Sequence, residues 1–151
     1  MDDRMFEQLG APDLKLEGLQ IWVHGRQLPD AHDYWDGNWL HVTAHCGGSR
    51  ASVFVTGSFI HLGELDRWSI EAQTLQKDLT GEAKLACMEP ELSVDLKCTS
   101  SGHITMEVRI TPDHMTQGHW FQYSIDQTYL ASLIDQCQSI LSEYPIRGSR
   151  A

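Results

Sequence analysis

The sequence lacks the features that mark secreted, membrane-spanning or disulfide-rich proteins. Its N-terminus, Met-Asp-Asp-Arg-Met-Phe-Glu, is acidic and has no apolar signal region. No apolar run approaches the ~20 residues that a membrane-spanning helix requires. The four cysteines have neither zinc-finger nor redox spacing, and they continue the apolar phases of predicted strands or of a helix. We therefore expect a cytoplasmic protein whose cysteines are small buried hydrophobic residues.

Catalytic signatures are missing as well. The sequence has no Gly-x-Ser-x-Gly elbow, no phosphate-binding glycine loop and no dinucleotide fingerprint. Glu89 and Glu91 flank Pro90, and solvation of a turn explains these carboxylates more simply than a glycosidase pair. No basic patch with interleaved aromatic residues points to nucleic-acid binding. The sequence thus predicts a non-enzymatic protein without a cofactor.

The most pronounced feature that is present is acidity. The chain of 151 residues carries 21 acidic and 11 basic side chains, a formal net charge of -10. Such a charge repels nucleic acid and anionic membranes, and it attracts a basic partner. It also serves to keep a cytosolic protein in solution, so both explanations stay open. The length suits one domain over residues 1–151, in which we expect 1–13 to form a loose N-terminal arm.

The hydrophobic periodicity predicts seven strands and two helices. Period-two alternation marks strands near residues 14–23, 39–46, 50–56, 83–87, 92–98, 104–110 and 121–125. Helical stripes run from Leu65 to Leu79, with Gly81 as the expected end, and from Leu130 to Tyr144, with Asp126 as the expected N-cap. The predicted order is β-β-β-α-β-β-β-β-α. We expect an α+β fold in two layers, a mostly antiparallel curved sheet packed against two α-helices, with a curled half-barrel as the alternative.

The segment from Asp30 to Leu40 combines carboxylates with aromatic side chains. A hard-cation site needs convergent oxygens, but the spacing is not that of an EF-hand loop. Asp36-Gly37-Asn38 is typical of a turn. Acidic groups beside exposed aromatic rings suit a basic partner. We predict a partner-binding surface formed by this segment with support from the first long helix: Asp30, Asp33, Tyr34, Trp35, Asp36, Glu64 and Glu71.

Eight histidines raise the question of a metal site. His41 and His45 point to the same polar face of one predicted strand, roughly 13 Å apart, which is too far for one metal ion. We interpret them as solvated or paired across strands, and we predict no metal. A small-molecule or metal-binding domain that uses His24, His41 and His45 remains an alternative. So does a homodimer that forms through an exposed edge strand.

Several short segments resemble one family of bacterial proteins. They are Leu19-Gln-Ile-Trp-Val-His-Gly25, Asp33-Tyr-Trp-Asp-Gly-Asn-Trp-Leu40, Glu89-Pro-Glu-Leu92, Asp126-Gln-Thr-Tyr-Leu130 and Tyr144-Pro-Ile-Arg-Gly148. Together they resemble bacterial immunity proteins of the WapI type and related uncharacterised small bacterial proteins. The resemblance implies a cytoplasmic protein that binds and blocks a toxin domain of a polymorphic toxin, without assigned catalytic residues. An acidic surface suits a basic toxin domain.

Overall fold

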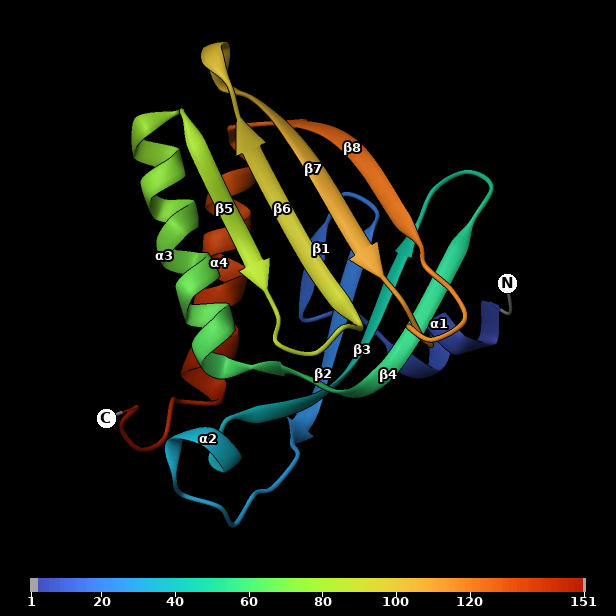
Figure 1. The fold of residues 1–151 in the computed structure, drawn as a ribbon, viewed down its shortest axis with the longest axis vertical. Coiled ribbons are helices and arrows are strands. Elements are labelled where there is room, and N and C mark those ends of the chain that lie inside the picture. The colour runs from blue at the N-terminus through green and yellow to red at the C-terminus, as the bar shows by residue number, and fades with distance from the viewer. Residues whose placement is uncertain (1–2, 151) are drawn as a thin grey trace.

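Figure 1 shows the protein as a computed structural model, which describes residues 3–150. In this part of the chain, eight strands form two four-stranded antiparallel sheets. The first sheet contains β1 (Leu14–Leu16), β2 (Leu19–Arg26), β3 (Trp39–Gly47) and β4 (Ser52–His61), and the second contains β5 (Gly81–Ala86), β6 (Leu92–Cys98), β7 (His103–Ile110) and β8 (Trp120–Asp126). The helices are α1 (Asp3–Leu9), α2 (Tyr34–Gly37), α3 (Leu62–Asp78) and α4 (Thr128–Glu143), with a short 3₁₀ turn at Ser100–Gly102. The predicted α+β class and antiparallel pairing are confirmed, but the strands are divided between two sheets instead of forming a single one.

The first sheet has one strand more than the apolar pattern predicts, because the stretch 14–23 bends back on itself. Glu17 adopts φ +50° and Gly18 follows it, so β1 and β2 form a tight hairpin. A Cβ atom on Gly18 would overlap the carbonyl oxygen of Gly47 and the hydroxyl group of Tyr123. Only glycine therefore fits this close approach of three backbone and side-chain segments.

The second sheet follows the predicted alternation strand by strand. Its order is β5-β6-β7-β8, and each pair runs antiparallel in an uninterrupted register. Alternate side chains point to the interior, where burial of apolar surface stabilises the fold. The fully buried members of this inner face are Ala83, Leu85, Val94, Leu96, Ile104, Met106, Val108 and Ile110.

Both long helices bury the apolar stripes that the sequence predicts. They lie side by side in Figure 1, where α3 packs against β5 and α4 packs against β1. The buried residues of both helices and both sheets belong to one hydrophobic cluster. The hydroxyl group of Tyr123 donates a hydrogen bond to the carbonyl oxygen of Gly47 at 2.6 Å and so links the two sheets. Within residues 3–150, no helix is both long and apolar enough to cross a membrane.

The helix ends differ in detail from the expectation. Leu79, rather than Gly81, closes α3 in the left-handed conformation at φ +54°, and its N–H donates to the carbonyl oxygen of Leu75 at 2.8 Å. Gly81 instead begins β5. The N-cap of α4 is Gln127, which makes no side-chain cap hydrogen bond, and not Asp126 as expected. The carboxylate of Asp126, one residue further out, accepts a hydrogen bond from the N–H of Thr128 at 2.8 Å.

Helix α1 corrects the expectation that residues 1–13 form a loose arm. The ring of Phe6 lies 6.1 Å from that of Trp22, 5.0 Å from that of His45 and 5.2 Å from that of Phe54, measured between centroids. Helix α1 therefore covers part of the outer face of the first sheet, where the ring of Phe6 packs against these three aromatic side chains. Residues 1 and 2 lie outside the described part of the chain.

Candidate partner-binding surface

The predicted contact residues that follow β2 lie together around α2. Asp33 is the N-cap of this one-turn helix, and its carboxylate accepts a hydrogen bond from the backbone N–H of Asp36 at 3.0 Å. Gly37 is the last residue of this turn. The position requires glycine, because a Cβ atom there would lie 2.7 Å from the carbonyl oxygen of Ala31. We name this set the α2 surface, in which every side chain but the half-buried Tyr34 is exposed: Asp30, Asp33, Tyr34, Trp35 and Asp36.

The side chain of Asn38 ties the α2 surface to the C-terminal segment. Its Nδ2 donates to the carbonyl oxygens of Tyr34 at 2.7 Å and Arg147 at 2.8 Å. Its Oδ1 accepts from the backbone N–H of Arg147 at 2.8 Å and from Nη1 of Arg26 at 3.2 Å. Asn38 is fully buried, so these contacts, which we name the Asn38 clasp, satisfy its carboxamide in place of water. Local sequence patterns indicated only a turn here, since the main partner lies 109 residues away.

Two arginines hold the same loop through its backbone carbonyl groups. Nη1 of Arg147 donates to the carbonyl oxygens of Pro29 at 2.6 Å and Ala31 at 2.8 Å. Nη1 of Arg26 donates to the carbonyl oxygen of Gly37 at 2.6 Å. Burial lowers the pKa of Arg26, and the charge of Arg147 acts in the same direction, yet a guanidinium keeps its proton at neutral pH. These cations therefore fix the loop backbone and leave the α2 carboxylates to the solvent.

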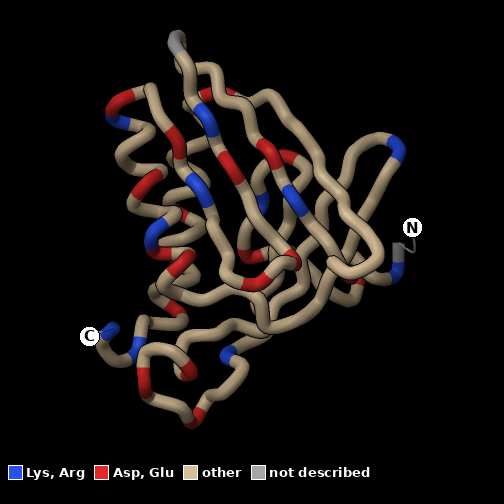
Figure 2. The backbone as a smooth tube through the Cα atoms, viewed as in Figure 1, with Lys and Arg blue, Asp and Glu red and all other residues tan. Residues whose placement is uncertain are grey.

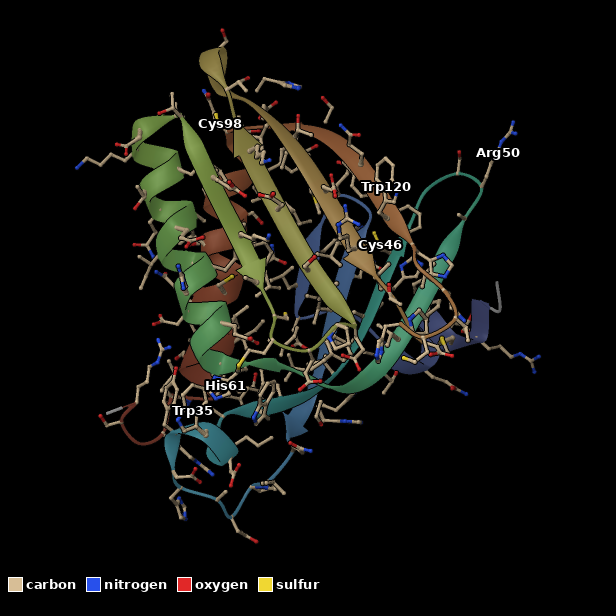
Figure 3. The ribbon with its side chains drawn as sticks, in the orientation of Figure 1. Trp35, Cys46, Arg50, His61, Cys98 and Trp120 are labelled. Carbon is tan, nitrogen blue, oxygen red and sulfur yellow. The ribbon has the colours of Figure 1, made fainter. Side chains whose placement is uncertain are left out.

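An aromatic cluster supports the exposed indole of the α2 surface. Trp35 is 46% exposed, its ring centroid lies 5.0 Å from that of Tyr34 and 5.8 Å from that of His61, and Cζ of Arg150 lies 5.8 Å above it. Figure 3 shows Trp35 and His61 in this corner of the molecule. Nδ1 of the buried His61 accepts from the N–H of Gly63 at 3.0 Å, and its Nε2 lies 3.0 Å from the carbonyl oxygen of Tyr34. The neutral tautomer with hydrogen on Nε2 satisfies both contacts.

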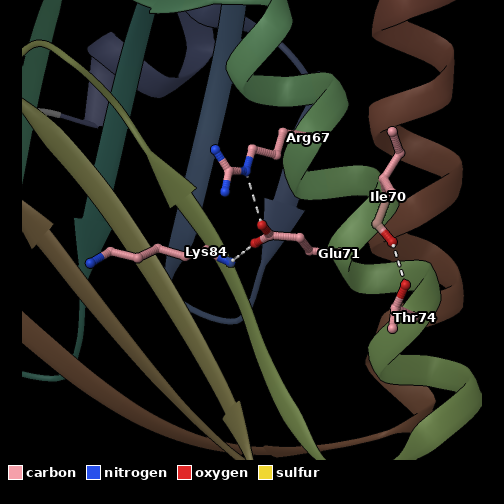
Figure 4. A network of polar contacts seen from close by, with 5 residues as sticks. All are labelled: Arg67, Ile70, Glu71, Thr74 and Lys84. Atoms are coloured by element: carbon pink, nitrogen blue, oxygen red, sulfur yellow. Dashed lines mark hydrogen bonds and ion pairs between the residues drawn. The ribbon is translucent and has the colours of Figure 1, made fainter.

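The two predicted contact residues of α3 make internal hydrogen bonds. Glu64 accepts from the N–H of the N-cap residue of α3 at 2.9 Å and from the N–H of Met88 at 2.7 Å, and burial raises its pKa. Figure 4 shows Glu71, which accepts from the backbone N–H of Lys84 at 2.9 Å and from Nε of Arg67 at 3.1 Å. Glu64 lies next to the α2 surface through the cap of α3. Glu71 lies about 10 Å further along the helix, given its rise of ~1.5 Å per residue, and is separate from that surface.

The acidic excess is not concentrated at the α2 surface. Figure 2 shows acidic and basic residues interspersed along the second sheet and around α2. The three aspartates of the α2 surface stand beside Arg26, Arg147 and Arg150. The local charge is therefore nearly balanced. The net charge of -10 acts on a partner from a distance, while contact at this surface rests on the aromatic ring and on hydrogen bonds.

The three histidines considered as a metal site, His24, His41 and His45, lie in different environments. The rings of His24 and His41 lie 5.7 Å apart, and Nε2 of His24 is hydrogen bonded to Oγ1 of Thr43 at 2.8 Å. His45 is only 8% exposed, because Phe6 of α1 covers it, and burial lowers its pKa. Of the two expected alternatives, His45 is therefore paired across strands and not solvated, since its Nε2 is hydrogen bonded to Oγ of Ser52 on β4 at 2.6 Å. Among the described residues, no group of three or more His, Cys, Asp or Glu side chains is arranged to hold a metal ion.

The cysteines are unpaired thiols. Cys46, Cys98 and Cys137 are buried, as predicted, whereas Cys87 is half-buried and lies beyond the end of β5. Burial raises the pKa of Cys46 to about 11 and that of Cys137 to about 12. These thiols therefore stay protonated at neutral pH and behave as small apolar side chains.

Fold and surface together define an α+β protein in which hydrogen bonds hold an exposed aromatic ring and its neighbouring carboxylates in place. The model of the immunity protein WapI-like family matches residues 13–145, which is most of the chain. The protein belongs to this family. The matched region contains both sheets, both long helices and the whole α2 surface, and it stops just before Arg147. No curated protein sequence matches the chain.

Proposed function

We propose that the protein is an immunity protein that neutralises a toxin domain in the cytoplasm by binding it non-covalently through the α2 surface. Membership of the immunity protein WapI-like family supports the class of function. The observation that carries the choice of surface is the half-exposed Trp35 between Asp33 and Asp36, held by the Asn38 clasp. The protein performs no chemistry on the toxin in this proposal.

The composition of the α2 surface suits an interface hot spot. Tryptophan and tyrosine are the residues that most often dominate binding energy, particularly where a polar rim excludes water around them. Trp35 supplies the apolar area, and Asp30, Asp33 and Asp36 supply the rim. The carboxylates would accept hydrogen bonds from lysine or arginine side chains of the toxin domain.

Rigidity adds to the affinity of such a surface. The Asn38 clasp and the two arginines fix the loop backbone before the partner arrives. A loop that is already ordered loses little conformational entropy on binding, so more of the contact energy appears as affinity. The charge of -10 would also steer a basic toxin domain toward the protein, and high salt would slow the encounter.

Co-expression in bacteria tests this proposal. Cells would carry a toxin domain encoded next to this gene together with the wild-type protein, the Trp35→Ala variant or the Trp120→Ala variant. Trp120 is a matched control, because it is also an exposed tryptophan, 58% against 46%, but lies on β8. We expect the wild type and Trp120→Ala to rescue growth and Trp35→Ala to fail at equal protein level. Rescue by Trp35→Ala would refute the choice of surface, and failure of the wild type would refute the function for that toxin.

A further inference from the structure

Side chains close the outer edges of two of the four edge strands. At β1, the carboxamide of Gln136 accepts from the backbone N–H of Lys15 at 2.6 Å and donates to its carbonyl oxygen at 3.1 Å. At β5, the carboxylate of Glu71 accepts from the N–H of Lys84 at 2.9 Å. A strand whose edge groups are occupied in this way cannot pair with another strand. The fold therefore protects these two edges against association.

The edge of β4 is interrupted by a bulge. In its ladder with β3, Leu40 faces Ile60 but Val42 faces Gly57, so β4 has two residues opposite one of β3. A bulge bends its strand and misaligns the backbone N–H and C=O groups. Such an edge pairs poorly with a further strand. The free edge of β4 is thus short and irregular.

The edge of β8 has none of these protections. β8 is the last strand of its sheet and pairs with β7 without a register shift. The N–H of Ile110 donates to the carbonyl oxygen of His119, and the N–H of Gln127 donates to that of Gly102, both at 3.1 Å. Antiparallel pairs alternate, so the even-numbered residues of β8 direct their N–H and C=O groups to the free edge: Trp120, Gln122, Ser124 and Asp126. No described side chain covers these groups as Gln136 covers those of Lys15, and residues 120–125 contain neither proline nor charge.

We propose that β8 pairs antiparallel with β8 of a second copy of the chain across a two-fold axis, which joins the two second sheets into one. An edge strand is complementary to itself in this arrangement, since each outward N–H meets an outward carbonyl group of the other copy. The register that overlaps the whole strand is centred on Tyr123 and places Gln122 opposite Ser124 of the partner subunit. The half-buried Phe121 and Tyr123 on the inner side of β8 would then lose further contact with water.

Charge supports a second copy as the occupant. In this register the carboxylates of the two Asp126 residues are six residues apart along the strands, about 20 Å. That separation exceeds the Debye length of ~8 Å at physiological ionic strength, so no like charges meet at the interface. The overall charge of -10 on each copy opposes association from a distance, and added salt should therefore strengthen the dimer. In Figure 1, α2 lies at the opposite end of the molecule from β8, so this dimer leaves the α2 surface free and does not depend on the proposed function.

Sedimentation and light scattering over a wide range of protein concentrations test the proposal. We expect a monomer–dimer equilibrium in the wild type that shifts toward dimer as salt increases. The Gln122→Pro variant removes one outward N–H, which β7 does not use, and should raise the dimer dissociation constant at least about tenfold. Thr56→Pro is the matched control, because alternation from the bonded pair Gly48 and Ala51 directs the N–H of Thr56 to the free edge of β4. Circular dichroism checks that both variants fold.

A cysteine trap tests the register even if the proline variant does not fold. Gln122 and Ser124 of the partner subunit would face each other as a hydrogen-bonded pair, with Cα atoms about 5.5 Å apart, which permits a disulfide. The double variant Gln122→Cys, Ser124→Cys should form a cross-linked dimer on mild oxidation, whereas each single variant should not. A strictly monomeric wild type, a dimer unaffected by Gln122→Pro, or a double variant that does not cross-link more than the single ones would overturn the proposal.

Discussion

Replacing Asn38 by alanine is expected to destabilise the protein by about 3 kcal/mol. The substitution removes a fully buried carboxamide and leaves the carbonyl oxygens of Tyr34 and Arg147 and the N–H of Arg147 without their partner. Each buried group that loses its hydrogen bond costs about 1–3 kcal/mol. Arg147 is only half-buried, so water replaces part of what is lost there. The total is therefore well below the sum of three full penalties.

Urea unfolding followed by circular dichroism measures this effect, and hydrogen exchange over residues 27–38 measures whether the loop opens locally. Gln136→Ala is the matched control, because Gln136 also hydrogen bonds to a backbone, that of Lys15, but is only half-buried and makes these bonds where water has access. We expect it to cost about 1 kcal/mol or less. If Asn38→Ala costs no more than Gln136→Ala, or if the loop exchanges as slowly as in the wild type, the clasp does not hold the α2 surface.

Two further substitutions test the packing and the charges of the fold. Gly18→Ala should destabilise by about 1–3 kcal/mol in urea unfolding, since its Cβ would overlap the carbonyl oxygen of Gly47, whereas Gly48→Ala meets no atom within 4 Å and should be nearly neutral; equal effects would contradict the close approach. Burial raises the pKa of Asp95 to about 6, and the Glu82 carboxyl adds to the shift. Because this folded-state pKa lies above the ordinary value, ionisation opposes folding and stability is lost as pH rises through about 6. Asp95→Asn should abolish that loss and gain about 1 kcal/mol at neutral pH once screening by water is allowed for; the same pH dependence in both proteins would contradict it.

The sequence predicted the helices and strands whose buried residues recur at regular spacing along the chain. Helix α3 buries the stripe that contains Trp68 and Leu75, and β6 buries the face that contains Val94 and Leu96. Hydrophobic periodicity predicts which face of a helix or strand is buried, so both elements could be found from the sequence. The division into two sheets was not predictable, because it depends on contacts between distant segments. The hairpin at Gly18 depends on Gly47 and Tyr123, and no local pattern indicates that these residues meet.

The candidate site shows the same distinction. The α2 surface was accessible to prediction because its members are neighbours in sequence and carry turn and cap chemistry. The Asn38 clasp was not, since its two halves lie at opposite ends of the chain. Glu64 and Glu71 fall on the polar face of α3, so the sequence predicted that their carboxylates are accessible to a partner. In the structure they accept hydrogen bonds from the backbone of Met88 and Lys84. A polar helix face can also meet the backbone of an edge strand, and amphipathicity alone does not separate the two.

Calorimetric titration of the purified toxin domain into the protein tests the central claim most directly. We expect Trp35→Ala to weaken binding by at least about 30-fold, the equivalent of about 2 kcal/mol for a hot-spot residue, while Trp120→Ala stays within about threefold of the wild type. The contrary result is a Trp35→Ala variant that binds as tightly as the wild type. It would show that the toxin domain binds elsewhere on the protein.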